Sequence, residues 1–143
     1  MIDDIDKKIL TILQQNARIS NAHIARELGV APSGIFERVK KLEQRGIIQG
    51  YHACVDHKKL GRGVTAFLVL HSGDRVGSIE GANRAAKIDE VEEVYHIAGE
   101  DGFMVKLRCA DNEELGRILR EKIGAIPSIK SSRTCVVMET IKE

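Results

Sequence analysis

Apolar residues in the first fifty positions recur every three or four residues, which is the spacing of a helix that buries one side. Three such segments follow one another and begin near Asp3, Ser20 and Pro32. The apolar stripe of the first consists of Ile5, Ile9, Ile12 and Leu13, and that of the third of Ile35, Val39 and Leu42. Three short helices with facing stripes can enclose one small core, so the pattern predicts a three-helix unit.

The residues between these segments are typical of helix ends. Ser20 is a good N-cap for the second helix, and Ile19 and Ile24 flank it at the spacing of a hydrophobic staple. Gly29 can adopt the left-handed conformation that ends a helix, and Pro32 suits the first turn of the next one. The second and third helices are therefore joined by a short, glycine-containing turn.

The third helix presents a polar face opposite its apolar stripe. At about 100° per residue, this face carries hydrogen-bonding and basic side chains: Ser33, Glu37, Lys40, Lys41, Gln44 and Arg45. Such a helix after a short turn is typical of a helix-turn-helix that enters a DNA major groove. Basic side chains neutralise phosphates, while Ser33, Glu37 and Gln44 can exchange hydrogen bonds with base edges. The alternative is an ordinary amphipathic helix with a solvated charged face.

The stretch after the third helix alternates in polarity over residues 47–56. This alternation predicts a strand that is either a wing of the DNA-binding unit or a connector. A polar, glycine-bearing stretch follows, and it indicates a domain boundary. We expect a DNA-binding domain at 1–50, a linker or hinge at 51–62 and a second domain at 63–143.

The second domain alternates strands and helices in a recognisable order. The pattern predicts strands at 64–71, 91–98, 103–109 and 131–141, with helices at 78–88 and 111–123. This βαββαβ order is that of a ferredoxin-like sheet, so the fold class is α+β. Two helices cover only one face of such a sheet. The other face must be polar or be covered by a second copy of the chain, so we expect a dimer. A dimer also suits two recognition helices that read a near-palindromic site.

The distribution of charge, the spacing of the cysteines and the hydropathy of the chain narrow the possible classes of function further. Residues 1–60 carry 10 lysines and arginines against 7 acids, whereas residues 61–143 carry 12 against 14, so the basic surplus lies with the helix-turn-helix. The three cysteines, Cys54, Cys109 and Cys135, are far apart, which predicts buried or half-buried thiols rather than disulfides, and no zinc site. No apolar run is long enough for a bilayer, and the acidic N-terminus lacks a signal-peptide core, so we expect a cytoplasmic protein with no membrane contact.

Taken together, these features resemble the leucine-responsive/AsnC (feast–famine) family of bacterial and archaeal transcription regulators over essentially the whole chain. The matching positions are Asp3, Asp6, Ile9 and Leu10, the stretch 18–51, Val55 with Asp56, Leu60 with Gly61, Gly99 with Phe103, and the stretch 133–143. The resemblance implies a winged helix-turn-helix joined by a strand linker to a ferredoxin-like (RAM-type) ligand-binding domain. It also implies homodimers that often assemble into octamers, double-stranded DNA as partner, and an amino acid or related metabolite as effector.

The resemblance places recognition-helix positions residue by residue. They are Ser33, Gly34, Phe36, Glu37, Arg38, Lys40 and Lys41, to which the polar face adds Gln44. We expect Ser33, Glu37 and Lys40 to face bases. Arg38 flanks the buried stripe, so it contacts either a phosphate or an acid of the same chain. Ala31 stands where the family commonly has a capping serine, and its absence costs roughly 0.5–2 kcal/mol of helix stability.

The resemblance also places a ligand-binding turn at residues 99–102. Family members typically carry an aspartate directly before the aromatic residue, where this chain has Gly102 and places Glu100 and Asp101 earlier. An amino-acid effector needs an anion for its ammonium, which Glu100 or Asp101 could supply. Its carboxylate needs donors, which the amides of Gly99 and Gly102 or the Thr134 hydroxyl could supply. The alternative is a plain hairpin turn.

Two other functions share parts of this pattern. Some tetrapyrrole decarboxylases resemble the same two-domain architecture, but none of the five histidines has a partner at catalytic spacing. We therefore expect no enzyme, no catalytic residue and no cofactor. A nucleoid-organising protein with little sequence preference differs from a regulator only in its specificity ratio.

Overall fold

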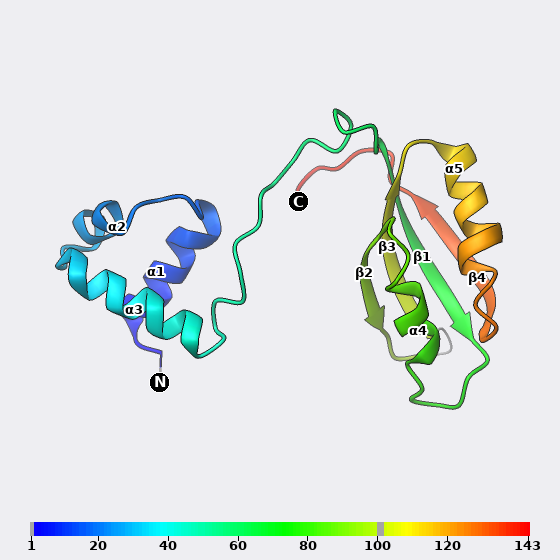
Figure 1. Cartoon of the computed structure of the whole chain (residues 1–143), viewed down its shortest axis with the longest axis horizontal. Coiled ribbons are helices and arrows are strands. Elements are labelled where there is room, and N and C mark those ends of the chain that lie inside the picture. The colour runs from blue at the N-terminus through cyan, green and yellow to red at the C-terminus, as the bar shows by residue number, and fades with distance from the viewer. Residues whose placement is uncertain (1, 100–101) are drawn as a thin grey trace. The chain divides into compact units, whose positions relative to one another are not determined.

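The structure is a computed structural model that describes residues 2–99 and 102–143 of the 143-residue chain. The chain divides into two compact units, residues 1–54 and 55–143, which are described one at a time (Figure 1). The first is helical and the second contains a sheet. This is the α+β class that the sequence predicts, with the helix-turn-helix preceding the sheet.

Three helices form the first unit: α1 (Asp4–Gln15), α2 (Asn21–Leu28) and α3 (Pro32–Gln44). The predicted helix ends are confirmed. Ser20 caps α2 by accepting a hydrogen bond from the His23 amide at 3.1 Å, and Gly29 ends that helix with φ = 68°. Pro32 is the first residue of α3, and Ala31 at the N-cap position supplies no capping side chain.

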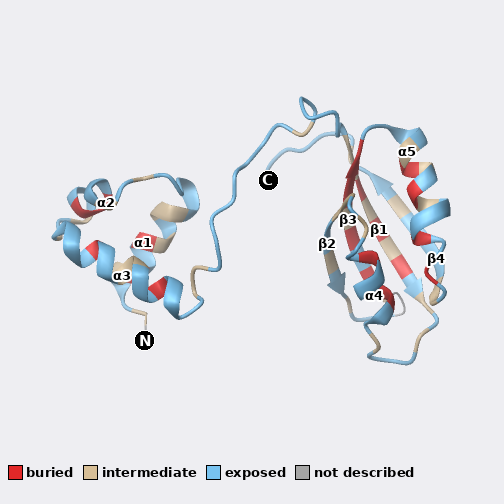
Figure 2. Cartoon of the chain, in the orientation of Figure 1, coloured by how far each residue is buried: buried red, intermediate tan, exposed pale blue. Residues whose placement is uncertain are grey.

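A small core holds these helices together. Its buried members come from the predicted stripes and are Ile9, Ile24, Ala25, Ile35 and Leu42, with half-buried neighbours such as Val39 around them (Figure 2). Ile35 and Leu42 are two helical turns apart on one side of α3 and are almost completely buried. Their burial fixes which side of α3 faces outward.

The prediction of a strand over residues 47–56 is wrong. Ile47 and Ile48 donate their amides back to the Leu42 carbonyl, which closes the end of α3. Residues 51–56 then run without regular secondary structure. Alternating polarity makes a strand only where a second strand offers its backbone, and no β-ladder in the described residues includes this stretch.

The second unit contains one antiparallel sheet with the order β2–β3–β1–β4. Its strands are β1 (Val64–Ser72), β2 (Val91–His96), β3 (Phe103–Cys109) and β4 (Ile129–Val136). Helix α4 (Glu80–Ala85) joins β1 to β2, and α5 (Asn112–Arg117) continues as a π-helix, η1 (Ile118–Ile123), before β4. The predicted βαββαβ order and the ferredoxin-like strand arrangement are confirmed.

Several predicted boundaries are wrong for identifiable reasons. The last strand spans Ile129–Val136 rather than 131–141, because its antiparallel pairing with β1 ends where Val136 lies opposite Ala66. Helix α4 is shorter than 78–88 because its last turn tightens: Lys87 and Ile88 donate to carbonyls three residues back. Strand β2 ends at His96 rather than at residue 98, because the pairing of β2 with β3 ends with His96 opposite Phe103.

The sheet buries one face beneath α4 and α5 (Figure 2). The buried residues of this core are Ala66, Leu68, Leu70, Ala82, Ala85, Phe103, Val105, Leu107, Cys109, Leu115, Ile118, Ile123 and Ile126. The alternation predicted for β3 is confirmed for its four inward residues. Arg108 departs from it, because this outward-facing side chain is only 7% exposed.

Candidate DNA interface and ligand-binding turn

Helix α3 presents the predicted polar residues to solvent. With Ile35 and Leu42 buried, Ser33, Glu37, Lys40 and Gln44 lie on the opposite side of the helix and are exposed. Gly34 and Lys41 are exposed beside them, and a side chain added at Gly34 would meet no atom within 4 Å. The helix therefore offers an open face with donors, acceptors and positive charge.

Phe36 and Arg38 lie at the two edges of this face. Phe36 is 54% exposed on the edge that leads to Tyr51, whose hydroxyl donates to Glu43 at 2.9 Å. Burial, and then Glu43, raise the pKa of the Tyr51 hydroxyl above its ordinary value. This hydrogen bond holds the chain that follows α3 against the side of the helix.

Arg38 occupies the other edge and pairs with two acids at the start of α1. Its Nη1 atom lies 2.6 Å from Asp3 Oδ2 and 2.8 Å from Asp6 Oδ1. The sequence left open whether Arg38 contacts a phosphate or an acid of the same chain. In the structure Arg38 pairs with acids of the same chain. The pKa of Asp3 lies below its ordinary value, chiefly because the Asp6 amide donates to it and then because Arg38 does.

The start of α3 has no side-chain cap. Ala31 occupies the N-cap position with an extended backbone and supplies no hydrogen-bonding group, while Pro32 needs no partner for an amide that it lacks. The departure from the family's serine thus leaves the recognition helix uncapped, as the sequence predicts.

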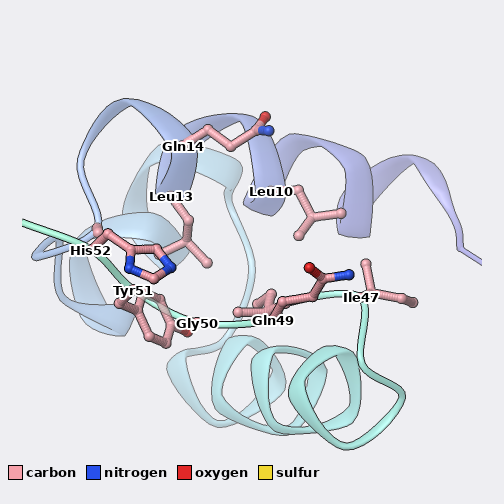
Figure 3. Close-up of a pocket in the computed structure, with 10 residues that line it drawn as sticks. Leu10, Leu13, Gln14, Ile47, Gln49, Gly50, Tyr51 and His52 are labelled. Carbon is pink, nitrogen blue, oxygen red and sulfur yellow. The ribbon is translucent and has the colours of Figure 1, made fainter. Parts of the chain in front are cut away.

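A groove of about 530 Å³ lies between α1 and the chain that follows α3 (Figure 3). Figure 3 shows Leu13, Tyr51 and His52 close together, with Leu10 and Ile47 farther along the same groove. The remaining lining residues are Gln14, Ala17, Ile48, Gln49 and Gly50. None of the predicted DNA contacts lines this groove, so it is separate from the polar face of α3.

The predicted ligand-binding turn joins β2 to β3. Glu100 and Asp101, the acids proposed for it, lie outside the described residues. Gly99 has φ = 116°, a conformation that favours glycine. Gly102 donates its amide to the Leu70 carbonyl at 2.9 Å, and a Cβ there would lie 3.2 Å from the Ser72 Cβ. The close approach to β1 explains why a side chain at position 102 would be crowded.

Thr134 lies away from this turn within one protomer. Thr134 is on β4, where it pairs with Leu68 of β1. Gly102 directly precedes β3, which lies on the other side of β1, so β1 runs between Thr134 and Gly102. Two strand spacings amount to roughly 10 Å. One protomer therefore does not bring the Thr134 hydroxyl together with the amides of Gly99 and Gly102.

The remaining candidate chemistry is sparse in the part of the chain that the structure describes. There, no three His, Cys, Asp or Glu side chains gather as metal ligands, and no helix is long and apolar enough to cross a membrane. The prediction of buried or half-buried thiols is confirmed for Cys109 and wrong for Cys54 and Cys135, which are exposed free thiols. His96 lies beside Phe103 with 5.5 Å between ring centroids.

A three-helix unit with an exposed polar face on its last helix, followed by a separate ferredoxin-like sheet, defines a class of DNA-binding regulators with a ligand-binding domain. Comparisons with known proteins agree. Residues 2–49 match the winged helix-turn-helix DNA-binding family, and residues 65–143 match the Lrp/AsnC ligand binding domain. The chain belongs to the Lrp/AsnC family of transcription regulators.

Its relatives extend over almost the whole chain. The HTH-type transcriptional regulator Ptr1 of Methanocaldococcus jannaschii is 38% identical, covering 100% of this chain and 96% of that protein. The leucine-responsive regulatory protein of Escherichia coli is 32% identical, with 99% and 88% covered. The structure of E. coli AsnC aligns with a TM-score of 0.90 at 32% identity, covering 100% of this chain and 96% of that one. These names describe regulators of transcription rather than enzymes, as the sequence predicts.

Proposed function

We propose that this regulator reads operator DNA with the outward face of α3. Ser33, Glu37 and Lys40 face base edges, and Lys41 contacts a phosphate. Gln44 adds a hydrogen-bonding group at the far end of the face, while Gly34 allows close approach and Phe36 contacts the groove wall. The observation that carries the proposal is the burial of Ile35 and Leu42, which leaves these side chains on one exposed face.

We further propose that two copies associate through the open face of the sheet. This face carries apolar side chains that are partly exposed, among them Tyr95 at 52% and Met104 at 36%. Contiguous exposed apolar side chains on a sheet are typical of an interface. A symmetric dimer would present two copies of α3 to two half-sites, and octamers would form from such dimers.

The domain limits belong to the same proposal: a DNA-binding domain at 1–50, a hinge at 51–62 and a ligand-binding and oligomerisation domain at 63–143. The division between the two compact units, after Cys54, falls inside this hinge and supports it. From Asp56 onward the hinge becomes ordered, because Asp56 Oδ1 accepts the amides of Lys58 and Lys59 at 3.1 and 3.3 Å. At the other end of the hinge Tyr51 is hydrogen-bonded to Glu43, so we propose that its flexible part lies between Tyr51 and Asp56.

We propose an amino acid as the effector, bound at the turn 99–102. The name of the leucine-responsive relative and the ligand-binding family match over residues 65–143 support this class of ligand. Glu100 or Asp101 would pair with the ammonium group, and the amides of Gly99 and Gly102 would donate to the carboxylate. Thr134 can join this site only from a second protomer.

The test is a fluorescence-anisotropy titration of the protein against the DNA upstream of its own gene. A scrambled duplex serves as control, at two salt concentrations, with and without a mixture of amino acids. Salt-sensitive binding at least about a thousandfold tighter than to the scrambled duplex is expected. Equal binding to both duplexes would instead indicate a nucleoid-organising role, and no binding to either would refute both. A shift of the affinity by the mixture is the result expected for an effector.

A further inference from the structure

The hydrogen bonds of Arg38 complete the coordination of two carboxylates. Asp3 Oδ1 accepts the Asp6 amide at 2.8 Å, and Asp6 Oδ2 accepts the Asp3 amide at 3.2 Å, which forms the capping box of α1. The other oxygen of each carboxylate accepts a hydrogen bond from Arg38 Nη1. All four carboxylate oxygens are therefore used, and the N-terminus of α1 is fixed to the middle of α3.

Burial makes this arrangement costly to leave. The side chain of Asp6 is 12% exposed and that of Arg38 is 33% exposed, whereas Asp3 is 53% exposed. If Arg38 turned outward to a phosphate, the Asp6 carboxylate would be separated from the cation beside it while remaining largely out of water. An unpaired buried charge is strongly unfavourable. The guanidinium therefore stays with the acids when DNA binds.

The position of the network on α3 gives it a role in recognition. Arg38 directly follows Glu37 in the sequence and lies one helical turn after Gly34, both of which belong to the proposed contact face. A base contact tolerates only small displacements, because a hydrogen bond weakens steeply with distance and angle. A tether at this point sets how far, and at what angle, the contact face stands out from α1.

We propose that Arg38, Asp3 and Asp6 are positioning residues for operator reading, and that Arg38 is not a phosphate contact. The role is indirect, since it acts through the placement of Glu37 and its neighbours. The inference rests on the proposed recognition face of α3. It differs from a purely structural pair, which would alter stability and leave discrimination between DNA sequences unchanged.

The decisive variant is Asp6→Asn, because two explanations predict opposite results. Removing a negative charge near DNA strengthens binding to any duplex if electrostatics alone matters. The positioning role predicts that binding to the operator weakens about tenfold, the value of one base contact, while binding to the scrambled duplex does not weaken. Asp4→Asn is the matched control, since Asp4 is exposed on the same helix and pairs with Lys7 instead of Arg38. It should leave the ratio of the two affinities unchanged.

Arg38→Gln supplies the second arm, with Lys41→Ala as the comparison. Because Lys41 is the proposed phosphate contact, Lys41→Ala should weaken binding to both duplexes alike and lower the salt slope by about 1. Arg38→Gln should weaken only operator binding and leave the slope as in the wild type. The double variant Asp6→Asn/Arg38→Gln should weaken operator binding no more than either single variant, because both substitutions break one network.

Other outcomes overturn the proposal. Equal weakening on both duplexes with a lower slope in Arg38→Gln would make Arg38 a phosphate contact. An unchanged affinity ratio in both single variants would leave the network a structural role only. Thermal melting identifies a variant that fails to fold, in which case Arg38→Lys, which retains one cation, is read in the same assay and should keep part of the discrimination. A wild-type protein that does not distinguish the duplexes refutes the recognition face itself, which is a separate result.

Discussion

The Nε atom of Arg108 lies 3.0 Å from a carboxylate oxygen of Glu92, although both residues belong to the open side of the sheet. The C-terminal residue covers this pair, since the Glu143 carboxylate contacts the Arg108 guanidinium and lies 2.7 Å from Lys106 Nζ. On the other side, His57 Nδ1 lies 4.0 Å from Glu92. The pair thus connects the hinge residue His57, two strands and Glu143.

Glu92→Gln should lower the free energy of unfolding of the second unit by about 1–3 kcal/mol, because Arg108 would lose one of its two charged partners, Glu92 and Glu143, while remaining buried. Urea unfolding followed by circular dichroism measures this loss. Glu121→Gln is the control: Glu121 is exposed, has no ion pair in the described part of the chain, and should change stability by less than about 0.5 kcal/mol. Equal midpoints for the two variants would contradict the prediction.

Acid should weaken the second unit through Glu90. The Lys122 ammonium, 2.6 Å away, is the main reason that the pKa of the Glu90 carboxyl lies below its ordinary value of 4.5. The unfolded chain therefore binds this proton first, so the stabilisation is complete above pH 4.5 and is lost as the pH falls through the lower, folded-state pKa. The wild type should therefore melt at a higher temperature than Lys122→Met above pH 4.5, and the two melting temperatures should converge as the pH is lowered. Lys87→Met, which removes an exposed lysine with no ion pair in the described residues, should parallel the wild type throughout.

Ala31→Ser should stabilise the first unit by roughly 0.5–2 kcal/mol, because a serine hydroxyl can accept a hydrogen bond from the first turn of α3. Differential scanning calorimetry measures the gain as a higher melting temperature of that unit. Ala22→Ser, an exposed position inside α2, should give no gain, since serine is a poorer helix former than alanine. If both variants melted like the wild type, the missing cap would have no energetic effect.

Replacing Glu100 with Gln together with Asp101 with Asn should abolish the response to amino acids and leave DNA binding intact, because only the anion for the ammonium is removed. Isothermal titration with single amino acids and the operator titration measure the two properties separately. Asp89→Asn with Glu113→Gln makes the same change of charge at exposed positions elsewhere and should retain the response. An unaltered ligand titration in the first pair would remove the turn from the site.

Local patterns predicted much of this fold. The spacing of Ile35, Val39 and Leu42 indicated the buried side of α3, and Ser20 and Gly29 marked helix ends, because caps and stripes depend on residues close in sequence. The ends of β4 could not be read this way. That strand ends at Val136 because its pairing with β1 ends at Ala66, and such a limit depends on the partner strand.

Long-range contacts account for the other differences. The alternation of β3 placed Arg108 on the outer face, but its burial depends on Glu143, thirty-five residues later in the chain. The sequence left the partner of Arg38 open for the same reason, because Asp3 and Asp6 are distant in sequence. Acids three positions apart at a helix start were visible, but nothing local indicated that they face α3.

The two hydrophobic cores have no residue in common, and each is enclosed within its own compact unit. A protein built in this way has two free energies of unfolding rather than one. Ligands stabilise only the unit that binds them, by an amount that depends on ligand concentration relative to Kd. Operator DNA should therefore raise one calorimetric transition and an amino acid the other, so that a single heating experiment reports both functions separately.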